Sequence, residues 1–157
     1  MNKNDIYKLK EFLVEAKRST YAAGDTVSKI IEPDFSTTLE FSKGDYSYHD
    51  NYHGGEPYGG RETVSLKGRP IYFMGYYGRV YDGVDLNLVY PVLQEALRLI
   101  PFNEPFRGPM EHLSGNFKYS NSSIGNVCNF YGSEVIYQNG VIIYEAKYVG
   151  GLIDIRR

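Results

Sequence analysis

The sequence predicts an α+β fold with an antiparallel β-sheet made of two related halves, an N-terminal helix and a buried central helix. The first observation behind this is an internal repeat. When the chain is shifted by 72 residues, 58–82 falls on 130–154 without a gap, and eight of the 25 positions are identical. Chance pairing at an average composition would give about one or two matches. The repeat therefore indicates one structural unit used twice.

The second observation is that each copy reads as a β-hairpin. Two runs rich in β-forming residues flank Asn139-Gly140 in the second copy and Lys67-Gly68 in the first. A glycine at the second position of a two-residue loop is typical of a tight hairpin turn. We therefore expect 58–80 and 130–152 to form equivalent hairpins.

The turn also predicts which residues share a face of the sheet. A two-residue loop pairs Val64 with Ile71 and Glu62 with Phe73, so Glu62 is expected on the face of these apolar residues. By the same count Glu134 lies on an apolar face of the second hairpin, with Ile136, Val141 and Ile143. A carboxylate on an apolar face needs a partner, so both glutamates should be buried and hydrogen-bonded. The opposite face of the first hairpin then carries Tyr72, Met74 and Tyr76.

The third observation is a pair of amphipathic segments outside the repeat. Residues 5–18 place apolar side chains at helical spacing, with Asn4 or Asp5 as the cap and the charged residues on a solvated face. Residues 86–100 carry a wide apolar stripe, which implies burial against the sheet. Because proline disrupts the interior of a helix, this second helix should start near Tyr90.

The remaining segments predict connections and strands. Residues 19–36 read as a loop, and 38–53 as strand. Three prolines and two glycines make 101–115 a long, stiffened loop, and such loops are often functional. Within it, Arg107 is expected to hydrogen-bond a carboxylate, with Asp50, Glu62 and Glu134 as the candidates, or a backbone carbonyl.

Composition bounds the class of protein. The 157 residues fit a single domain, and a net charge of −2 gives no footprint for direct binding of nucleic acid or a membrane surface. A single cysteine, Cys128, excludes an internal disulfide and fits a reducing compartment. The sequence begins without a signal peptide and has no 18-residue apolar run. We therefore predict a cytoplasmic protein.

A few residues are candidates for a ligand site. Asp50 alternates with tyrosines along one face of its strand, and the chain has 16 tyrosines and no tryptophan. His49 and His53 share the other face but lie roughly 13 Å apart along a strand, too far to share a metal. The sequence therefore predicts neither a metal nor a cofactor. The predicted ligand-binding residues are Asp50, Glu62, Tyr76, Arg107, Glu134 and Tyr148.

Four segments together resemble a known family: 45–50, 58–78, 106–109 and 130–151. They are similar to an uncharacterised bacterial family, a domain of unknown function that is sometimes fused behind a helix-turn-helix DNA-binding domain. The resemblance implies a domain of nearly this length and no particular chemistry. Tyr72 stands where we associate a tryptophan with the family. Since no DNA-binding domain is seen in this chain, a regulatory role would require a partner.

Three functions stay open on these grounds. Nucleophile elbows, zinc-protease motifs and phosphate loops are absent, and this favours binding over catalysis. The first hypothesis is a small-molecule-binding or sensory module, in which both halves line a cleft of tyrosines and carboxylates for a polar ligand. The second is a hydrolase that uses Glu62 and Glu134 as an acid/base pair. The third is a protein-interaction domain.

Overall fold

A computed structural model describes residues 1–154 of the chain. Within these residues the fold is α+β, with two helices and an open, nine-stranded antiparallel sheet, which confirms the predicted class. The helical elements are α1 (Lys3–Ser19), the short 3-10 element η1 (Tyr21–Thr26) and α2 (Leu86–Arg98). The strands are β1 (Ile30–Ile31), β2 (Thr37–Lys43), β3 (Tyr46–His53), β4 (Tyr58–Leu66), β5 (Arg69–Val80), β6 (Glu111–Ser114), β7 (Phe117–Asn126), β8 (Asn129–Gln138) and β9 (Val141–Leu152).

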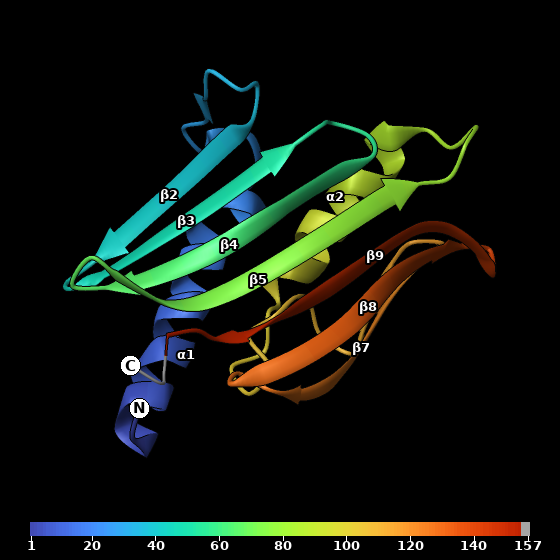
Figure 1. Ribbon diagram of the computed structural model, residues 1–157. Coiled ribbons are helices and arrows are strands. Elements are labelled where there is room, and N and C mark those ends of the chain that lie inside the picture. Colours follow the sequence, from blue (N-terminus) through green and yellow to red (C-terminus); the bar gives the residue numbers. More distant parts are fainter. Residues whose placement is uncertain (155–157) are drawn as a thin grey trace.

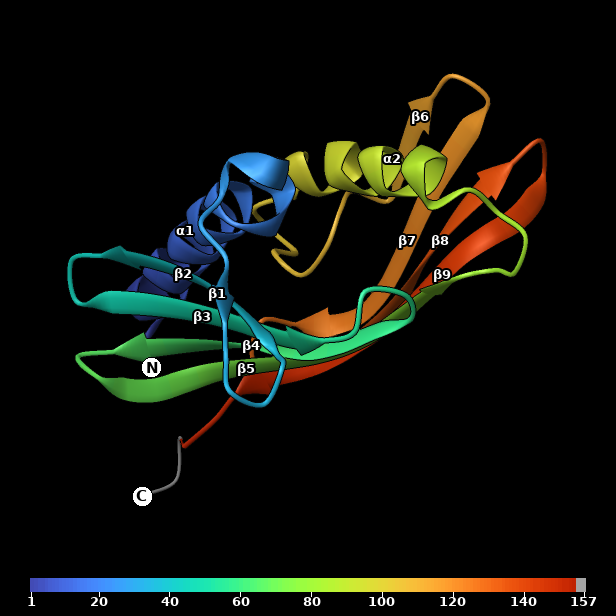
Figure 2. The same cartoon turned by 90° about the horizontal axis from the view of Figure 1, so that it is seen from above.

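The sheet consists of two four-stranded meanders, β2–β5 and β6–β9, joined at their last strands, and the short β1 extends the first meander at its edge. The strand order is β1-β2-β3-β4-β5-β9-β8-β7-β6, so β5 and β9 meet in the middle (Figure 1). Both helices lie on the same, concave side of the curved sheet (Figure 2). The two segments predicted to be loops contain short regular elements: 19–36 contains η1 and β1, and 101–115 contains β6. Each half is a helix followed by a meander.

The two hairpins have the same turn and the same irregularity. Both turns hold two residues at positive φ, Lys67 with Gly68 and Asn139 with Gly140. In β4–β5 the register shifts between Val64 and Ser65, and in β8–β9 it shifts at the equivalent place, between Ile136 and Tyr137. The duplicated sequence therefore encodes a duplicated bulge.

This bulge corrects the predicted faces. An extra residue in one strand moves every later side chain to the other face. Val64 consequently pairs with Tyr72, and Glu62 with Met74 rather than Phe73. Glu134 likewise pairs with Ala146. The glutamates thus share their face with the tyrosines that were expected on the opposite side, and they do not share it with Phe73.

A pseudo-twofold axis passes between β5 and β9. Tyr76 pairs with Tyr148, its own counterpart in the repeat. Tyr72 pairs with Leu152, while Val80 pairs with Tyr144, so the pairing is symmetric about that central tyrosine pair. Equivalent residues from the two halves therefore meet at the junction of the sheet.

The helices differ from prediction at their N-termini. Asn2, not Asn4 or Asp5, caps α1: its side chain accepts from the Asp5 backbone N–H, and Asp5 returns the bond in a capping box. Helix α2 starts at Leu86 rather than near Tyr90, because the Asp85 side chain caps it one turn earlier. Pro91 therefore lies inside the helix and not in its first turn.

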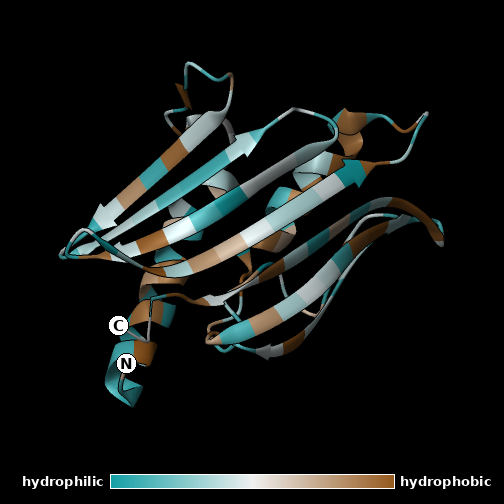
Figure 3. Cartoon of the chain, viewed as in Figure 1, coloured by the Kyte–Doolittle hydropathy of each residue, from teal (hydrophilic) through white to brown (hydrophobic). Residues whose placement is uncertain are grey.

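The buried side chains form two groups on the concave side. Helix α1 packs against β2 and β3 and covers a group that includes Leu9, Leu13 and Val64. Helix α2 packs against β7 and covers a group that includes Leu93 and Ile136. Hydrophobic and hydrophilic residues alternate along the strands (Figure 3), as expected when only one face is covered. No helix within residues 1–154 is long and apolar enough to cross a membrane.

A repeated glycine makes room for the central tyrosines. Gly60 pairs with Tyr76 and Gly132 with Tyr148, and each tyrosine ring lies over its glycine. A Cβ added at Gly132 would lie 2.4 Å from the Tyr148 ring carbon that bears the hydroxyl.

We therefore expect Gly132→Ala to lower the free energy of unfolding by about 1–3 kcal/mol, the usual cost of overpacking. Urea denaturation would measure this. Gly55→Ala is the matched control, since nothing lies within 4 Å of its added Cβ. Equal denaturation midpoints for the two variants would contradict the packing argument.

Candidate functional site

Each half of the sheet carries one buried cluster of a glutamate, three tyrosines and one Asx residue. The clusters correspond strand by strand, because Asp50 pairs with Glu62 as Asn121 pairs with Glu134. We call the first cluster Tyr48, Asp50, Glu62, Tyr72 and Tyr76, and the second cluster Tyr119, Asn121, Glu134, Tyr144 and Tyr148. Both glutamates are buried, as predicted, at 3% and 0% exposure.

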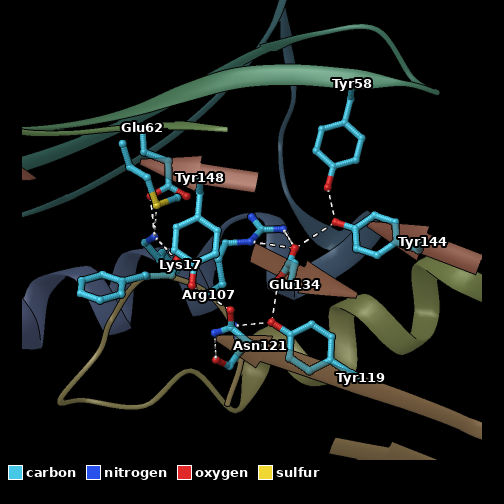
Figure 4. Close-up of polar contacts among 12 residues, drawn as sticks. Lys17, Tyr58, Glu62, Arg107, Tyr119, Asn121, Glu134, Tyr144 and Tyr148 are labelled. Atoms are coloured by element: carbon cyan, nitrogen blue, oxygen red, sulfur yellow. Dashed lines mark hydrogen bonds and ion pairs between the residues drawn. The ribbon is translucent and has the colours of Figure 1, made fainter. Parts of the chain in front are cut away.

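In the second cluster Glu134 has partners on both oxygens. Arg107 donates to Oε1 through Nε at 3.0 Å and through Nη2 at 2.6 Å. Tyr144 also donates to Oε1, at 2.9 Å, and Tyr119 donates to Oε2 at 2.5 Å (Figure 4). The expected bond between Arg107 and a carboxylate is confirmed, and Glu134 is the carboxylate. This buried charge is fully compensated.

The loop after α2 is fixed over this cluster by its neighbours. The Phe106 ring stacks on Phe130 with centroids 3.8 Å apart. The Gly108 backbone N–H donates to the Tyr119 hydroxyl at 3.0 Å, and its carbonyl accepts from Asn121 at 2.9 Å. The backbone of Gly108 and the guanidinium of Arg107 together therefore cover the second cluster and fill the space above it.

The first cluster uses a lysine where the second uses an arginine. Lys17 Nζ lies 2.6 Å from Glu62 Oε2 and donates to the Phe106 carbonyl at 2.6 Å. Burial lowers the pKa of Lys17, while the charge of Glu62 opposes that shift. We expected the charged residues of α1 on a solvated face, and for Lys17 this is wrong: it is 7% exposed. Its position beside the apolar stripe, next to Ala16, was the available signal.

Asp50 is the point at which the two clusters differ in charge. The Tyr76 hydroxyl donates to Asp50 Oδ1 at 2.5 Å, just as the Tyr148 hydroxyl donates to Asn121 Oδ1 at 2.7 Å. The first cluster therefore holds an ionisable acid where the second holds a neutral amide. Burial, together with the neighbouring charge of Glu62, raises the pKa of Asp50 to about 7.

A cavity of about 150 Å³ lies beside the first cluster, between α1, η1, α2 and the sheet. Four charged side chains line it: Lys17, Asp50, Glu62 and Arg107. Six tyrosines also line it, and Leu97, Ile100 and Phe106 add apolar surface. The tyrosines are Tyr21, Tyr48, Tyr52, Tyr58, Tyr76 and Tyr90. The combination of one polar corner and apolar walls is usual for a small-molecule site.

The structure therefore brings four of the six predicted ligand residues to one cavity. Asp50, Glu62, Tyr76 and Arg107 line it. Glu134 and Tyr148 do not, since Glu134 lies behind the Arg107 guanidinium and Tyr148 belongs to the second half. Sequence reasoning missed Lys17 and five of the tyrosines as lining residues, because they come from five separate elements: α1, η1, β3, β4 and α2. These tyrosines are Tyr21, Tyr48, Tyr52, Tyr58 and Tyr90. Among residues 1–154, no group of three or more His, Cys, Asp or Glu side chains has the arrangement of a metal site.

Comparison with known proteins identifies the family. The pattern of the domain of unknown function DUF5680 matches residues 50–153, and the chain belongs to that family. The matched segment includes Asp50, Glu62, Arg107 and Glu134 but not Lys17 of α1. Neither a curated protein nor a solved structure matches the chain.

The clusters differ in one further hydroxyl. In the second cluster the Tyr144 hydroxyl contacts the Tyr58 hydroxyl at 2.5 Å. The counterpart of Tyr58 is Phe130, which stacks on Tyr72 with centroids 6.0 Å apart and has no hydroxyl to offer. Within the described part of the chain the buried Tyr72 hydroxyl has no hydrogen-bond partner.

Tyr144→Phe and Tyr72→Phe should therefore behave oppositely. Tyr144→Phe removes two hydrogen bonds in a buried network and should cost about 1–3 kcal/mol of unfolding free energy. Tyr72→Phe removes a desolvated, unpaired hydroxyl and should be neutral or stabilising. Thermal and urea denaturation of both variants would measure the difference. A larger loss from Tyr72→Phe than from Tyr144→Phe would contradict this account of the network.

The raised pKa of Asp50 makes a second prediction, about stability and pH. The folded state binds the Asp50 proton more tightly than the unfolded state, whose carboxyl has a pKa near 3.8. This contribution to stability is thus present below about pH 4 and is lost as the pH rises towards 7. The charged and titratable groups facing Asp50 are Glu62 of β4, Tyr76 of β5, Lys17 of α1 and Arg107 of the loop.

Asp50→Asn, which copies the second cluster, should therefore gain stability relative to wild type as the pH is raised from 5 to 8. Since one pKa unit corresponds to about 1.4 kcal/mol, the relative gain should be at least about 1 kcal/mol. Urea titrations at several pH values would measure it. Glu40→Gln, an exposed residue in β2, is the control and should show no such trend. A pH-independent difference for Asp50→Asn would show that this carboxyl does not titrate in the range.

Proposed function

We propose that the chain is a small-molecule-binding or sensory module, with the cavity beside the first cluster as its site. The observation that carries the proposal is Asp50, a buried acid at the cavity whose hydrogen-bond partner is a single tyrosine hydroxyl. An incompletely paired buried acid costs free energy. Such a cost is common at sites that bind ligands and uncommon in purely structural cores.

The second half provides an internal comparison. There the same backbone unit carries Asn121 instead of Asp50, and the loop around Arg107 and Gly108 covers it. The space that is filled in the second half is open in the first. A duplicated unit that keeps one copy closed and neutral, and leaves the other open and acidic, supports a binding role for the open copy.

Catalysis by Glu62 and Glu134 has less support. Glu134 accepts four hydrogen bonds, three on Oε1 and one on Oε2, from one arginine and two tyrosines. Its side chain is fully buried, so a substrate does not reach it. The carboxylates that lie side by side are Asp50 and Glu62, on paired strands. If the module is an enzyme, this pair is the place to look for acid/base chemistry.

One observation favours a second candidate, a protein-interaction role. The uncovered face of the sheet carries Tyr77, Ile124, Tyr131 and Val149, each more than half exposed, around a shallow hollow. Exposed apolar patches often mark protein contacts. The family resemblance leads us to propose that the partner is a protein with a DNA-binding domain.

We also propose a cytoplasmic location, which the exposed, unpaired thiol of Cys128 fits.

The test is a thermal-shift screen of metabolites, nucleosides, sugars and short peptides. A ligand of the folded state raises the melting temperature by mass action. Ala22→Leu adds bulk to the cavity wall and should abolish the shift, while Glu40→Gln on the other face should retain it. A hit that persists in Ala22→Leu would place binding elsewhere. Conversion of a hit to product would move the assignment to an enzyme, and failure of the whole screen would leave the uncovered face as the better candidate.

A further inference from the structure

The charges around the cavity indicate what kind of ligand it takes. Two cations and two carboxylates line the cavity, and a third carboxylate, Glu134, lies directly behind Arg107. Each cation is paired with a glutamate, Lys17 with Glu62 and Arg107 with Glu134. Asp50 is left with the hydroxyl of Tyr76 on Oδ1. Within residues 1–154 no group donates a hydrogen bond to Asp50 Oδ2. With Asp50 ionised, the cluster thus carries one negative charge in excess.

One added positive charge would balance this cluster. A proton on Asp50 does so, and so would a monocationic ligand beside Oδ2. An anionic ligand would increase the excess of negative charge in a place where charge is poorly screened. A divalent metal would need about six oxygen ligands, and one uncommitted carboxylate does not supply them. The charge pattern therefore selects a monocation.

The walls of the cavity suit an organic cation. The rings of Tyr58 and Tyr76 are tilted by 60° with centroids 6.0 Å apart, and those of Tyr58 and Tyr90 by 52° with centroids 6.5 Å apart. Adjoining rings at these angles form a corner rather than a flat stack. Tyrosine faces attract ammonium groups through their quadrupole, most strongly when water is excluded.

The volume limits the size of the ligand. A cavity of about 150 Å³ is similar to engineered apolar cavities in other proteins that hold one benzene molecule. A ligand of about five to eight non-hydrogen atoms therefore fits without rearrangement of the chain.

We propose that this cavity binds a small organic monocation, an amine or quaternary ammonium whose charged group pairs with Asp50 Oδ2 and whose carbon atoms contact the tyrosine rings. The proposal rests on the small-molecule-binding function proposed above and specifies its ligand class. A proton and the ligand compete for the same carboxylate. Affinity should therefore rise with pH until Asp50 is ionised and then level off.

Matched pairs of probes test the proposal by calorimetry on the intact chain. The pairs are choline with its neutral isostere 3,3-dimethyl-1-butanol, and n-butylamine with 1-butanol; butyrate is the anionic probe. For at least one pair we expect the cation to bind wild type 10-fold or more tightly than its isostere, and butyrate to be weakest. Choline carries its charge at every pH, so its affinity should be about 10-fold higher at pH 8 than at pH 6.

Variants locate the interaction. Asp50→Asn should fold, since the second half uses asparagine at the equivalent position, and it should lose 10-fold or more in affinity for the cation and the pH dependence as well. Ala22→Leu should abolish binding of every probe, and Glu40→Gln should change nothing.

The outcomes separate this inference from the proposed function. If a neutral isostere or butyrate binds as well as the cation, and Ala22→Leu abolishes that binding, the cavity is a ligand site but the charge argument is wrong. Unchanged affinity for the cation in Asp50→Asn, or from pH 6 to 8 in wild type, also overturns it. If no cation binds at millimolar concentration the inference fails, and if no compound of the wider screen binds either, the proposed function fails with it.

Discussion

The ion pair between Arg107 and Glu134 is the contact on which the rest of this structure depends. A fully buried carboxylate is tolerated only when its charge and lone pairs are matched, and Arg107 supplies the charge. The position of Arg107 also fixes its neighbour Phe106, whose backbone carbonyl accepts a hydrogen bond from Lys17 of α1. One loop thus links both buried clusters, joins the N-terminal helix to the second half of the sheet, and closes one side of the cavity.

The duplication shows how one backbone unit supports two different local environments. Bulge, turn and the central tyrosine over its glycine are the same in both halves. The two halves differ at few positions. The first half has Asp50 and Tyr58 where the second has Asn121 and Phe130, and its glutamate pairs with a lysine from a helix instead of an arginine from a loop. These substitutions leave the second half neutralised and filled. In the first half they leave an acid beside open space, at some cost in stability.

Membership of a family of unknown function, with no matching solved structure, means that fold analogy offers no reaction or ligand. The site itself therefore indicates binding. The second half shows how the same strands are arranged when asparagine replaces the acid at the position of Asp50. In the first half, buried charge, aromatic walls and enclosed volume coincide.

The sequence by itself determined the duplicated hairpins, the burial of Glu62 and Glu134 and a hydrogen-bonded role for Arg107, whose acceptor, a carboxylate or a backbone carbonyl, it left open. These follow from turn chemistry, local periodicity and the cost of an unpaired buried charge, all readable from nearby residues. Only the tertiary structure decided the face of each strand, the burial of Lys17 and the lining of the cavity. A single extra residue at a bulge moves every later side chain of its strand to the opposite face, and no local sequence pattern identifies that residue. The cavity itself depends on contacts between segments far apart in the chain, which periodicity does not encode.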